Sequence, residues 1–494
     1  MATAKESKEL YATLAKLGGK QDSEEDIQYA GTKLIIPEQF RGKDLSEVAK
    51  FIEKVNKDQN SQVQFTANFN YRPWDGAYNA YQAIKKMFGM VQAKPQPGFF
   101  GPKPPQFIQV PINKDETVEV PWGDFAVPLL EDSTIRFGAS MSDEYGQIFN
   151  ITITGPRRHR FVVQGLFEVV RKELSEFSIY MGKAIDGANM PHFIDLSGVD
   201  PSKVVYSRSA KVQLENELWS YIDWPEETKK ALGMPSKRAV LLEGTFGTGK
   251  TLTANTTALK AVANGMTFIQ ARAGQDNFFE VMQTARLYQG NKGAIVFLED
   301  ADTLVTNGGD GEELSRLLDV FDGIQSKATK IMVVMTTNHP DVLTQGMRRP
   351  GRIDRTIKIG LLDDEGVEAL TRIVVGNMLD PEVDFTQVCA AMEGYPPAFI
   401  KESLDSSKRY AATRNDGVLA GLTITTDDIV FSAEGMRDQF VWMKGEVEVE
   451  SLSLENAMDA RIKKSLAVLA APKDYRDGSV WNEDALTNLQ PNVN

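Results

Sequence analysis

The second half of the chain alternates short apolar runs with longer amphipathic stretches. Continuous apolar runs of this length are typical of strands that are buried on both faces, as in a parallel sheet covered by helices. A helical segment follows at about 364–440. We therefore predict an α/β domain built on a parallel sheet, with strands near residues 238–242, 266–270, 294–298, 331–335 and 356–361.

The N-terminal part of the chain mixes helical and strand-like periodicities. Residues 161–180 place apolar side chains three and four positions apart, on one helical face. Residues 94–105 contain five prolines and two glycines, which exclude a regular helix or a central strand there. We expect an α+β domain with helices at 45–56, 76–91 and 161–180 and strands at 61–71, 107–111, 117–127 and 147–154.

A chain of 494 residues is too long for one core, because a domain typically contains ~100–200 residues. The changes of pattern along the chain predict five segments. They are a polar arm at 1–30, an α+β N-terminal domain at 31–195, a large α/β subdomain at 196–362, a small helical subdomain at 363–441, and a C-terminal helix with a flexible tail at 442–494.

The composition is that of a soluble globular protein, with 42% hydrophobic and 25% charged residues. The sequence lacks an apolar run long enough for a membrane span and an apolar N-terminal signal, and its one cysteine, Cys389, fits a reducing compartment. We therefore expect a cytoplasmic protein. A formal charge of −13 makes nucleic acid an unlikely partner for the surface as a whole. The basic cluster at 157–160 is either a solvated turn or a contact for an acidic partner.

A glycine-rich phosphate loop follows the first predicted strand of the sheet. The pattern is Gly244-x-x-x-x-Gly249-Lys250-Thr251, with a strand before it and a helix after it. Glycines let backbone N–H groups turn toward phosphates, the lysine reaches the β- and γ-phosphates, and the threonine hydroxyl takes a magnesium position. We expect the nucleotide to contact Gly244, Thr245, Phe246, Gly247, Thr248, Gly249, Lys250, Thr251 and Leu252.

The strand at 294–298 ends in two acids, Glu299 and Asp300. In P-loop ATPases the usual order at this point is Asp and then Glu. By position we expect Glu299 to act on the magnesium side, together with Thr251, and Asp300 to polarise the attacking water. The reversed order lengthens the first side chain and shortens the second by one methylene, and both carboxylates are retained. The order is therefore compatible with catalysis.

Two further features lie downstream of the acids. The strand at 331–335 leads to Asn338, whose amide can hydrogen-bond the attacking water or the γ-phosphate. Residues 347–355 carry four arginines broken by Pro-Gly, and such a loop projects guanidinium groups that bind phosphate oxygens. Arginines this far along the chain from the phosphate loop can serve the nucleotide of another subunit in a ring.

These motifs, in this order and spacing, resemble the AAA family of P-loop ATPases over roughly residues 200–435. The resemblance implies use of ATP and Mg²⁺, a helical lid after the large subdomain, and a homo-oligomeric ring that is usually a hexamer. It implies that Asn338 is the sensor residue and that Arg349 and Arg352 are arginine fingers for a neighbouring subunit. It also implies that Gly394 and Ala398 lie in the lid turn that flanks the adenine.

The Leu-Glu-Asp-x-Asp strand and the Met-Thr-Thr-Asn-His stretch are most similar to the AAA branch that contains the mitochondrial Rieske-protein translocase, in which the reversed acid order is active. Phe246 departs from the family, which usually has proline there, and the aromatic-apolar-Gly pore loop of unfoldases is absent. Phe278 and Phe279 are either pore aromatics or core residues, and their helical spacing favours the interpretation as core residues. The N-terminal domain resembles no family that we recognise, and in AAA proteins this region normally receives a substrate or adaptor.

The leading hypothesis is an ATPase ring that remodels, translocates or disassembles a protein substrate. A nucleic-acid-remodelling motor and an ATP-gated scaffold with little turnover are the alternatives.

Overall fold

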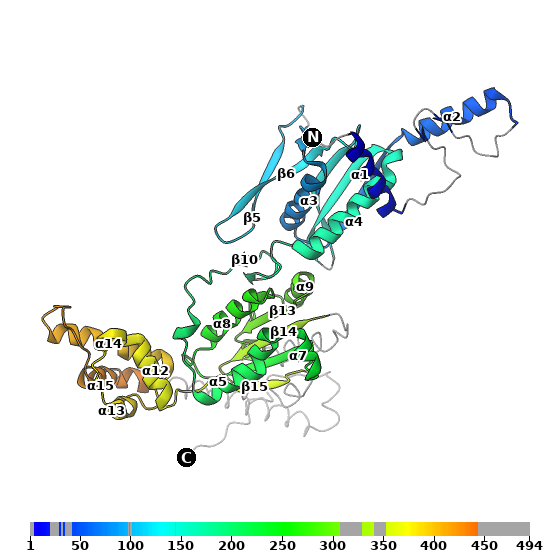
Figure 1. Cartoon of the computed structure of the whole chain (residues 1–494). Coiled ribbons are helices and arrows are strands. Elements are labelled where there is room, and N and C mark those ends of the chain that lie inside the picture. The colour runs from blue at the N-terminus through cyan, green and yellow to red at the C-terminus, as the bar shows by residue number, and fades with distance from the viewer. Residues whose placement is uncertain are drawn as a thin grey trace, which may run out of the picture. The chain divides into compact units, whose positions relative to one another are not determined.

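The computed structural model describes residues 4–19, 29–30, 33–34, 42–96, 98, 101–143, 145–306, 329–339 and 352–442. The chain divides into two compact units, Met1–Gly366 and Val367–Asn494. Figure 1 shows the elements of both, coloured along the chain. The predicted C-terminal helix at 454–470 lies outside the described residues.

A seven-stranded sheet forms the centre of the nucleotide-binding part of the first unit. Its strand order is β10-β9-β12-β13-β14-β11-β15. All neighbouring pairs are parallel except β9 with β10. The strands are β9 (Ala184–Asp186), β10 (His192–Phe193), β11 (Arg238–Glu243), β12 (Thr267–Arg272), β13 (Ala294–Glu299), β14 (Ile331–Thr337) and β15 (Arg355–Lys358). The predicted parallel α/β sheet is confirmed.

Helices cover both faces of this sheet, so the largely apolar central strands β11, β13 and β14 are buried along most of their length. One face packs with α8 (Lys250–Ala263) and the segment around Trp219, and the other face packs with α9 (Phe278–Tyr288). The segment before β11 contains α5 (Arg208–Leu214), a π-helical turn at Glu215–Trp219, α6 (Ser220–Asp223) and α7 (Glu226–Ala231). The short α10 (Thr303–Thr306) follows β13.

The N-terminal part of the same unit contains a second, antiparallel sheet in the order β3-β8-β7-β6-β4, with β5 also paired to β6. The strands are β3 (Gln62–Phe69), β4 (Gln92–Ala93), β5 (Gln106–Pro111), β6 (Thr117–Ala126), β7 (Thr134–Ser142) and β8 (Gly146–Pro156). The helices are α1 (Ala4–Leu17), α2 (Leu45–Gln59), α3 (Pro73–Phe88) and α4 (Arg160–Phe177). An α+β arrangement is what the mixed periodicity predicts.

Helix α1 packs closely against α4 (Figure 1). Leu14 and Ala15 of α1 are buried, so the polar arm contains a helix with an apolar face. The approach depends on a glycine in α4, because a Cβ at Gly165 would lie 1.8 Å from the carbonyl oxygen of Leu14. The predicted arm is therefore held against the domain at this point.

A seam joins the two sheets of the first unit. One continuous cluster of buried apolar residues includes Phe149 and Leu166 of the N-terminal part and Val281 and Met282 of α9. Arg72 donates from its two terminal nitrogens to the carbonyl oxygens of Tyr145, at 3.0 Å, and Ala188, at 2.9 Å. The N-terminal sheet is thus packed against the ATPase sheet through α9.

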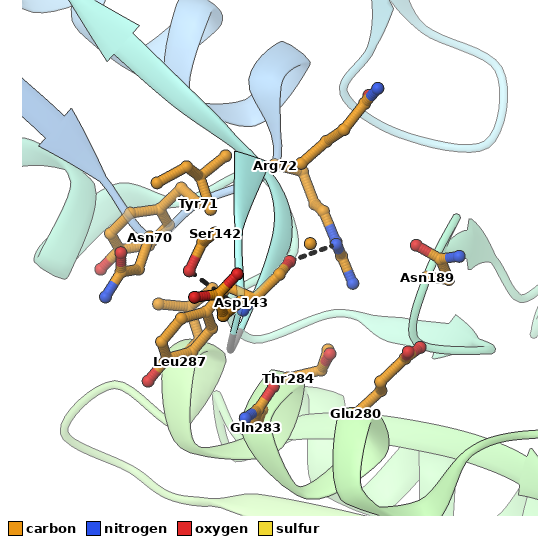
Figure 2. Close-up of a pocket in the computed structure, with 14 residues that line it drawn as sticks. Asn70, Tyr71, Arg72, Ser142, Asp143, Asn189, Glu280, Gln283, Thr284 and Leu287 are labelled. Carbon is orange, nitrogen blue, oxygen red and sulfur yellow. Dashed lines mark hydrogen bonds between the residues drawn. The ribbon is translucent and has the colours of Figure 1, made fainter. Parts of the chain in front are cut away.

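A small cavity of about 150 Å³ remains in the seam. Figure 2 shows Arg72, Asp143 and Asn189 on one side of it and side chains of α9, including Glu280 and Gln283, on the other. Polar side chains line the cavity from both sides, together with Tyr71, Ile148 and Leu287.

A buried carboxylate fixes the turn that leads from α4 into β9. Asp75, at the start of α3, accepts hydrogen bonds from Ser178 Oγ (2.8 Å), the Ile179 backbone N–H (3.0 Å) and Asn79 Nδ2 (2.7 Å). Burial raises the pKa of Asp75 to about 6, although these donors oppose the shift. Asp75 therefore ties α3 to the turn between the two sheets.

The second unit is helical, with α12 beginning just before it. Its helices are α12 (Asp364–Val375), α13 (Phe385–Ala391), α14 (Pro397–Arg414) and α15 (Thr426–Gly435). A capping box between Thr425 and Asp428 begins α15, and Arg414 of α14 binds the same Asp428 carboxylate at 2.8 Å. These contacts connect the two longest helices that lie wholly within the unit.

Several elements differ from the sequence prediction. The long strand β7 was not predicted, and neither were the short strands β9 and β10, which extend the ATPase sheet to residues before 196. Phe278 packs against the core as predicted, but Phe279 is 49% exposed, so its interpretation as a core residue is wrong. Of the basic cluster, Arg157 pairs with Asp58 of α2 at 2.8 Å and His159 is buried.

Candidate nucleotide site

The phosphate loop joins β11 to α8. The loop starts at Gly244, whose backbone N–H donates to the carbonyl of Thr337 at the end of β14 (3.3 Å). A Cβ at Gly244 would lie 2.2 Å from the Ile359 carbonyl oxygen, so this position requires glycine. Gly247 and Gly249 have φ angles of 75° and 103°, which side-chain-bearing residues rarely adopt. The predicted glycines therefore shape a turn at the carboxyl end of the central strand.

The first turn of α8 faces this loop without a side-chain cap. Gly249 is the N-cap residue and supplies no capping group, so the early N–H groups of the 14-residue helix remain available to an anion. Thr251 is exposed in the first turn, and Thr248 is buried with its hydroxyl donating to the Thr245 carbonyl at 2.8 Å. A helix N-terminus after a glycine turn is the arrangement that holds phosphate groups.

Lys250 lies at the centre of the site. Its Nζ donates to the carbonyl oxygens of Gly244 (2.6 Å) and Thr245 (3.0 Å) and to Asn338 Oδ1 (2.7 Å). Burial lowers the pKa of Lys250, while the carboxylates of Asp300 and Asp302 act in the opposite direction. The ammonium is thus partly desolvated beside two carboxylates, where it can interact strongly with an anionic ligand.

The acids stand at the end of β13 with different exposure and backbone geometry. Glu299 is the last residue of the strand and is partly buried, whereas Asp300 is exposed. Asp300 has a φ of 52°, in the left-handed region that non-glycine residues seldom occupy and that aspartate tolerates better than most. An unusual backbone angle at this position motivates a functional interpretation.

Hydrogen bonds from β14 and α10 hold Asp300 in this conformation. The Asp300 backbone N–H donates to Thr336 Oγ1 (3.0 Å), and the following N–H, of Ala301, donates to the Thr336 carbonyl (2.8 Å). The Asp300 carbonyl accepts from both the N–H (2.9 Å) and the hydroxyl (2.8 Å) of Thr303. The sequence alone does not identify Thr336 as a site residue. Its contact with Asp300 arises only because β14 pairs with β13.

Asn338 connects the other residues of the site. Its Nδ2 donates to Asp300 Oδ1 (3.1 Å), its Oδ1 accepts from Lys250, and its backbone N–H donates to Asp302 Oδ1 (3.4 Å). A continuous chain Lys250–Asn338–Asp300 therefore joins the phosphate loop, the sensor strand and the acid strand. The three motifs are separated in sequence, and the parallel sheet brings them together at the carboxyl ends of its strands.

An aromatic contact also spans the site. The rings of Phe246 and His339 meet edge to face, with centroids 6.4 Å apart and an interplanar angle of 74°. Phe246 occupies the loop position where the resemblance leads us to expect proline, and His339 directly follows Asn338. Besides the hydrogen bond from Gly244 to Thr337, this ring contact also connects the phosphate loop to the residues that follow β14.

The residues present fit a nucleotide with its magnesium ion. The glycine turn, the uncapped helix and Lys250 are suited to phosphates, while the Thr251 hydroxyl and the Glu299 carboxylate are hard oxygen ligands of the kind that Mg²⁺ uses, often through water. Within the described ranges, no group of three or more histidine, cysteine or acidic side chains could hold a metal ion. A magnesium ion here would take its other ligands from the nucleotide and from water.

The remaining predicted site residues belong to later parts of the chain. Arg349 lies outside the described residues, while Arg352 lies just before β15 and is partly buried. Gly394 has a φ of 81° and Ala398 is exposed in the first turn of α14, both in the second unit. Their proposed contacts with a neighbouring nucleotide and with adenine stay predictions.

A parallel sheet with a phosphate loop, an acid pair and a polar residue at the carboxyl ends of neighbouring strands defines the P-loop nucleoside triphosphatase class. Comparison with protein families gives a more specific result. Residues 240–361 match the family described as ATPase family associated with various cellular activities (AAA). The chain therefore carries an AAA-type P-loop ATPase domain over these residues.

Known relatives agree with this assignment. The chain is 29% identical over 249 residues to the ATP-dependent zinc metalloprotease FtsH of Hahella chejuensis, covering 47% of this chain and 40% of that protein. It is 31% identical over 238 residues to the FtsH of Lactococcus lactis subsp. lactis, covering 43% and 33%. It is 31% identical over 240 residues to FtsH 2 of Symbiobacterium thermophilum, covering 45% and 38%.

The chain thus spans no more than about two fifths of the length of these relatives. No helix in the described part of the chain is long and apolar enough to cross a membrane.

Proposed function

We propose that this chain is a subunit of a ring-shaped ATPase that remodels or moves a protein substrate. The hydrogen-bonded chain Lys250–Asn338–Asp300 is the observation that carries the proposal. It puts a phosphate-binding amine, a neutral amide and a carboxylate in contact, and these are the groups needed to hold a γ-phosphoryl group and orient an attacking water.

Each side chain has a distinct role in this proposal. Lys250 and the backbone of the loop hold the phosphates, and Thr251 and Glu299 face the magnesium ion, which neutralises phosphate charge when bound. Asp300 and Asn338 orient the water. Because Asp300 accepts from Asn338 and is fixed at its backbone by Thr336, the shorter acid has a defined position despite the reversed order.

The ring is the second part of the proposal. Arg349 and Arg352 stabilise the transferring phosphoryl charge of a neighbouring subunit, a contribution that is worth ~10³–10⁵ in rate where an arginine finger operates. The N-terminal part receives the protein substrate. Its packing against α9 supports this assignment, because movement of the ATPase sheet would be passed directly to the N-terminal sheet.

Mixing two inactive variants tests the ring. Lys250→Ala weakens nucleotide binding within a subunit, and Arg352→Ala removes the proposed finger, so each variant alone should release phosphate slowly. In an equal mixture, about a quarter of the interfaces combine an intact Lys250 with an intact neighbouring Arg352, and activity should return at those interfaces. If Arg352→Ala is fully active alone, or the mixture stays inactive, the intersubunit assignment is wrong.

A further inference from the structure

A basic pocket lies at the amino ends of the ATPase-sheet strands, whereas the nucleotide site lies at their carboxyl ends. It has a volume of about 310 Å³ and is lined by α7, the residues before β11, and the starts of the adjacent strands. Arg238 begins β11, which leads to the phosphate loop, and Lys330 directly precedes β14, which leads to Asn338. Strands of this length separate the two sites by ~20 Å.

The lining carries an excess of positive charge. Five lining side chains are cationic, namely Lys229, Lys230, Arg238, Lys292 and Lys330, whereas Glu226 is the one carboxylate among the lining residues. A concave surface with this balance is unusual in a chain whose formal charge is −13. It favours an anionic ligand.

The single carboxylate is already shared. Glu226 pairs with Lys229 at 2.7 Å and with Lys330 at 3.3 Å, and the hydrogen bond from Lys229 is the main reason that the pKa of Glu226 is lowered. Neither Lys230 nor Lys292 has a carboxylate partner in the part of the chain that the structure describes. These two amines therefore remain available to a ligand.

Arg238 gives an independent indication of a missing acceptor. Its side chain is more than nine-tenths buried, contacts Glu217 and the hydroxyl of Tyr221, and lies with its guanidinium 4.3 Å from the centre of the Tyr221 ring. Its Nε–H is nevertheless buried without a hydrogen-bond acceptor among the described residues. A buried donor without a partner is unfavourable, so an acceptor atom from a ligand or its hydration shell would satisfy it.

Much of the remaining lining is apolar. Met234, Pro235, Met266 and Met332 contribute apolar surface, and Tyr221 and Ser236 also line the pocket. Methionine side chains adjust readily to small apolar groups. An inorganic anion would leave this part of the surface unused.

We propose that this pocket binds a small phosphate monoester with a short apolar group. A phosphate dianion presents several acceptor oxygens at once, which suits separate donors on Lys230, Lys292 and Lys330 better than a monovalent carboxylate does. The apolar group packs among the methionines. The site is separate from the ATPase chemistry, so its test does not depend on the proposed function.

Titration calorimetry with butyl phosphate, inorganic phosphate and butanol tests the site on the full chain. The wild type is compared with Lys292→Gln/Lys330→Gln and with the charge-matched control Lys172→Gln/Lys211→Gln, whose lysines are exposed away from the pocket. Lys250→Ala is the fourth protein, because a phosphate ester could also enter the phosphate loop.

We expect butyl phosphate to bind the wild type, the control and Lys250→Ala with similar affinity, and to bind Lys292→Gln/Lys330→Gln about tenfold more weakly or worse. Inorganic phosphate should bind more weakly than the ester. Unchanged affinity in Lys292→Gln/Lys330→Gln would overturn the proposal. So would loss of binding in Lys250→Ala, which assigns the ligand to the nucleotide site, or butanol binding as tightly as the ester.

Discussion

At the scale of single residues, backbone and side-chain contacts give a defined position to Asp300, the second acid of the reversed pair. Asp300 is one methylene shorter than the usual glutamate, and its left-handed backbone is fixed by hydrogen bonds from its own and the following N–H groups to Thr336. Its carboxylate is in turn held by Asn338. The conformation of Asp300 therefore depends on a neighbouring strand.

Replacing the Thr336 hydroxyl should lower turnover. Thr336→Val keeps the shape of the side chain but removes the acceptor of the Asp300 N–H, a loss of about 0.5–1.5 kcal/mol. We expect kcat to fall by up to about tenfold, with KM for ATP nearly unchanged, since the phosphate loop is untouched. Steady-state phosphate release measures both. Thr336→Ser retains the hydroxyl and should stay close to the wild type.

Replacing each of the two acids should have a different effect on catalysis. Asp300→Asn removes the water-side carboxylate, and we expect kcat to fall by about 10² or more while ATP binding persists. Glu299→Gln weakens the magnesium side, so the Mg²⁺ concentration needed for half-maximal phosphate release should rise. Titrating Mg²⁺ against both variants separates the roles. If Asp300→Asn alone changes the Mg²⁺ requirement, the assignments are interchanged.

At the scale of elements, the seam between the two sheets depends on a buried carboxylate. The folded-state pKa of Asp75, about 6, lies above its ordinary value of 3.8 because the side chain is buried. A raised carboxyl pKa adds stability that is fully present below the unfolded pKa and is lost as pH rises through the folded pKa. The window for Asp75 is therefore about pH 4 to 6.

Asp75→Asn should remove this pH dependence. Relative to the variant, the wild type should lose about 2 kcal/mol of unfolding free energy between pH 4 and pH 6. Urea unfolding followed by tryptophan fluorescence reports it, since Trp74 donates to the hydroxyl of Tyr180 at the seam. Parallel pH profiles for the two proteins would show that Asp75 does not titrate in this window.

The contact of α1 with α4 gives a second test at this scale. Gly165→Ala places a methyl group against the Leu14 carbonyl, and such overpacking costs about 1–3 kcal/mol. A Cβ at Gly198 would meet no atom within 4 Å, so Gly198→Ala is the matched control. We expect a lower melting temperature for the first variant only. Equal melting temperatures would mean that α1 moves away at no cost.

The sequence predicts those features that short-range patterns determine. Buried strands such as β11 and β13 appear as apolar runs. Lys250 follows from the glycine-rich loop pattern, and Glu299 and Asn338 follow from their places at strand ends. The left-handed turn at Asp300 could not be predicted, because Thr336 is brought beside it by strand pairing. Strands β9 and β10 contain three and two residues, too few to give a periodic signal, and they form because β12 offers a free edge.

At the scale of the whole molecule, we propose that a neighbouring subunit in a ring completes the nucleotide site. Within the described chain, Lys250, Asn338 and Asp300 already form one network, whereas Arg349 and Arg352 are proposed to act on a neighbour. A site completed by a second subunit should gain activity when subunits associate.

The most direct test is steady-state phosphate release from ATP, with Mg²⁺, over a wide range of protein concentration. The account predicts that activity per subunit rises steeply with concentration and then reaches a plateau as rings fill. Such a curve would show that the Glu299–Asp300 pair is catalytic and that a neighbour completes the site. Negligible release at concentrations where the protein is assembled and ATP is bound would contradict the account.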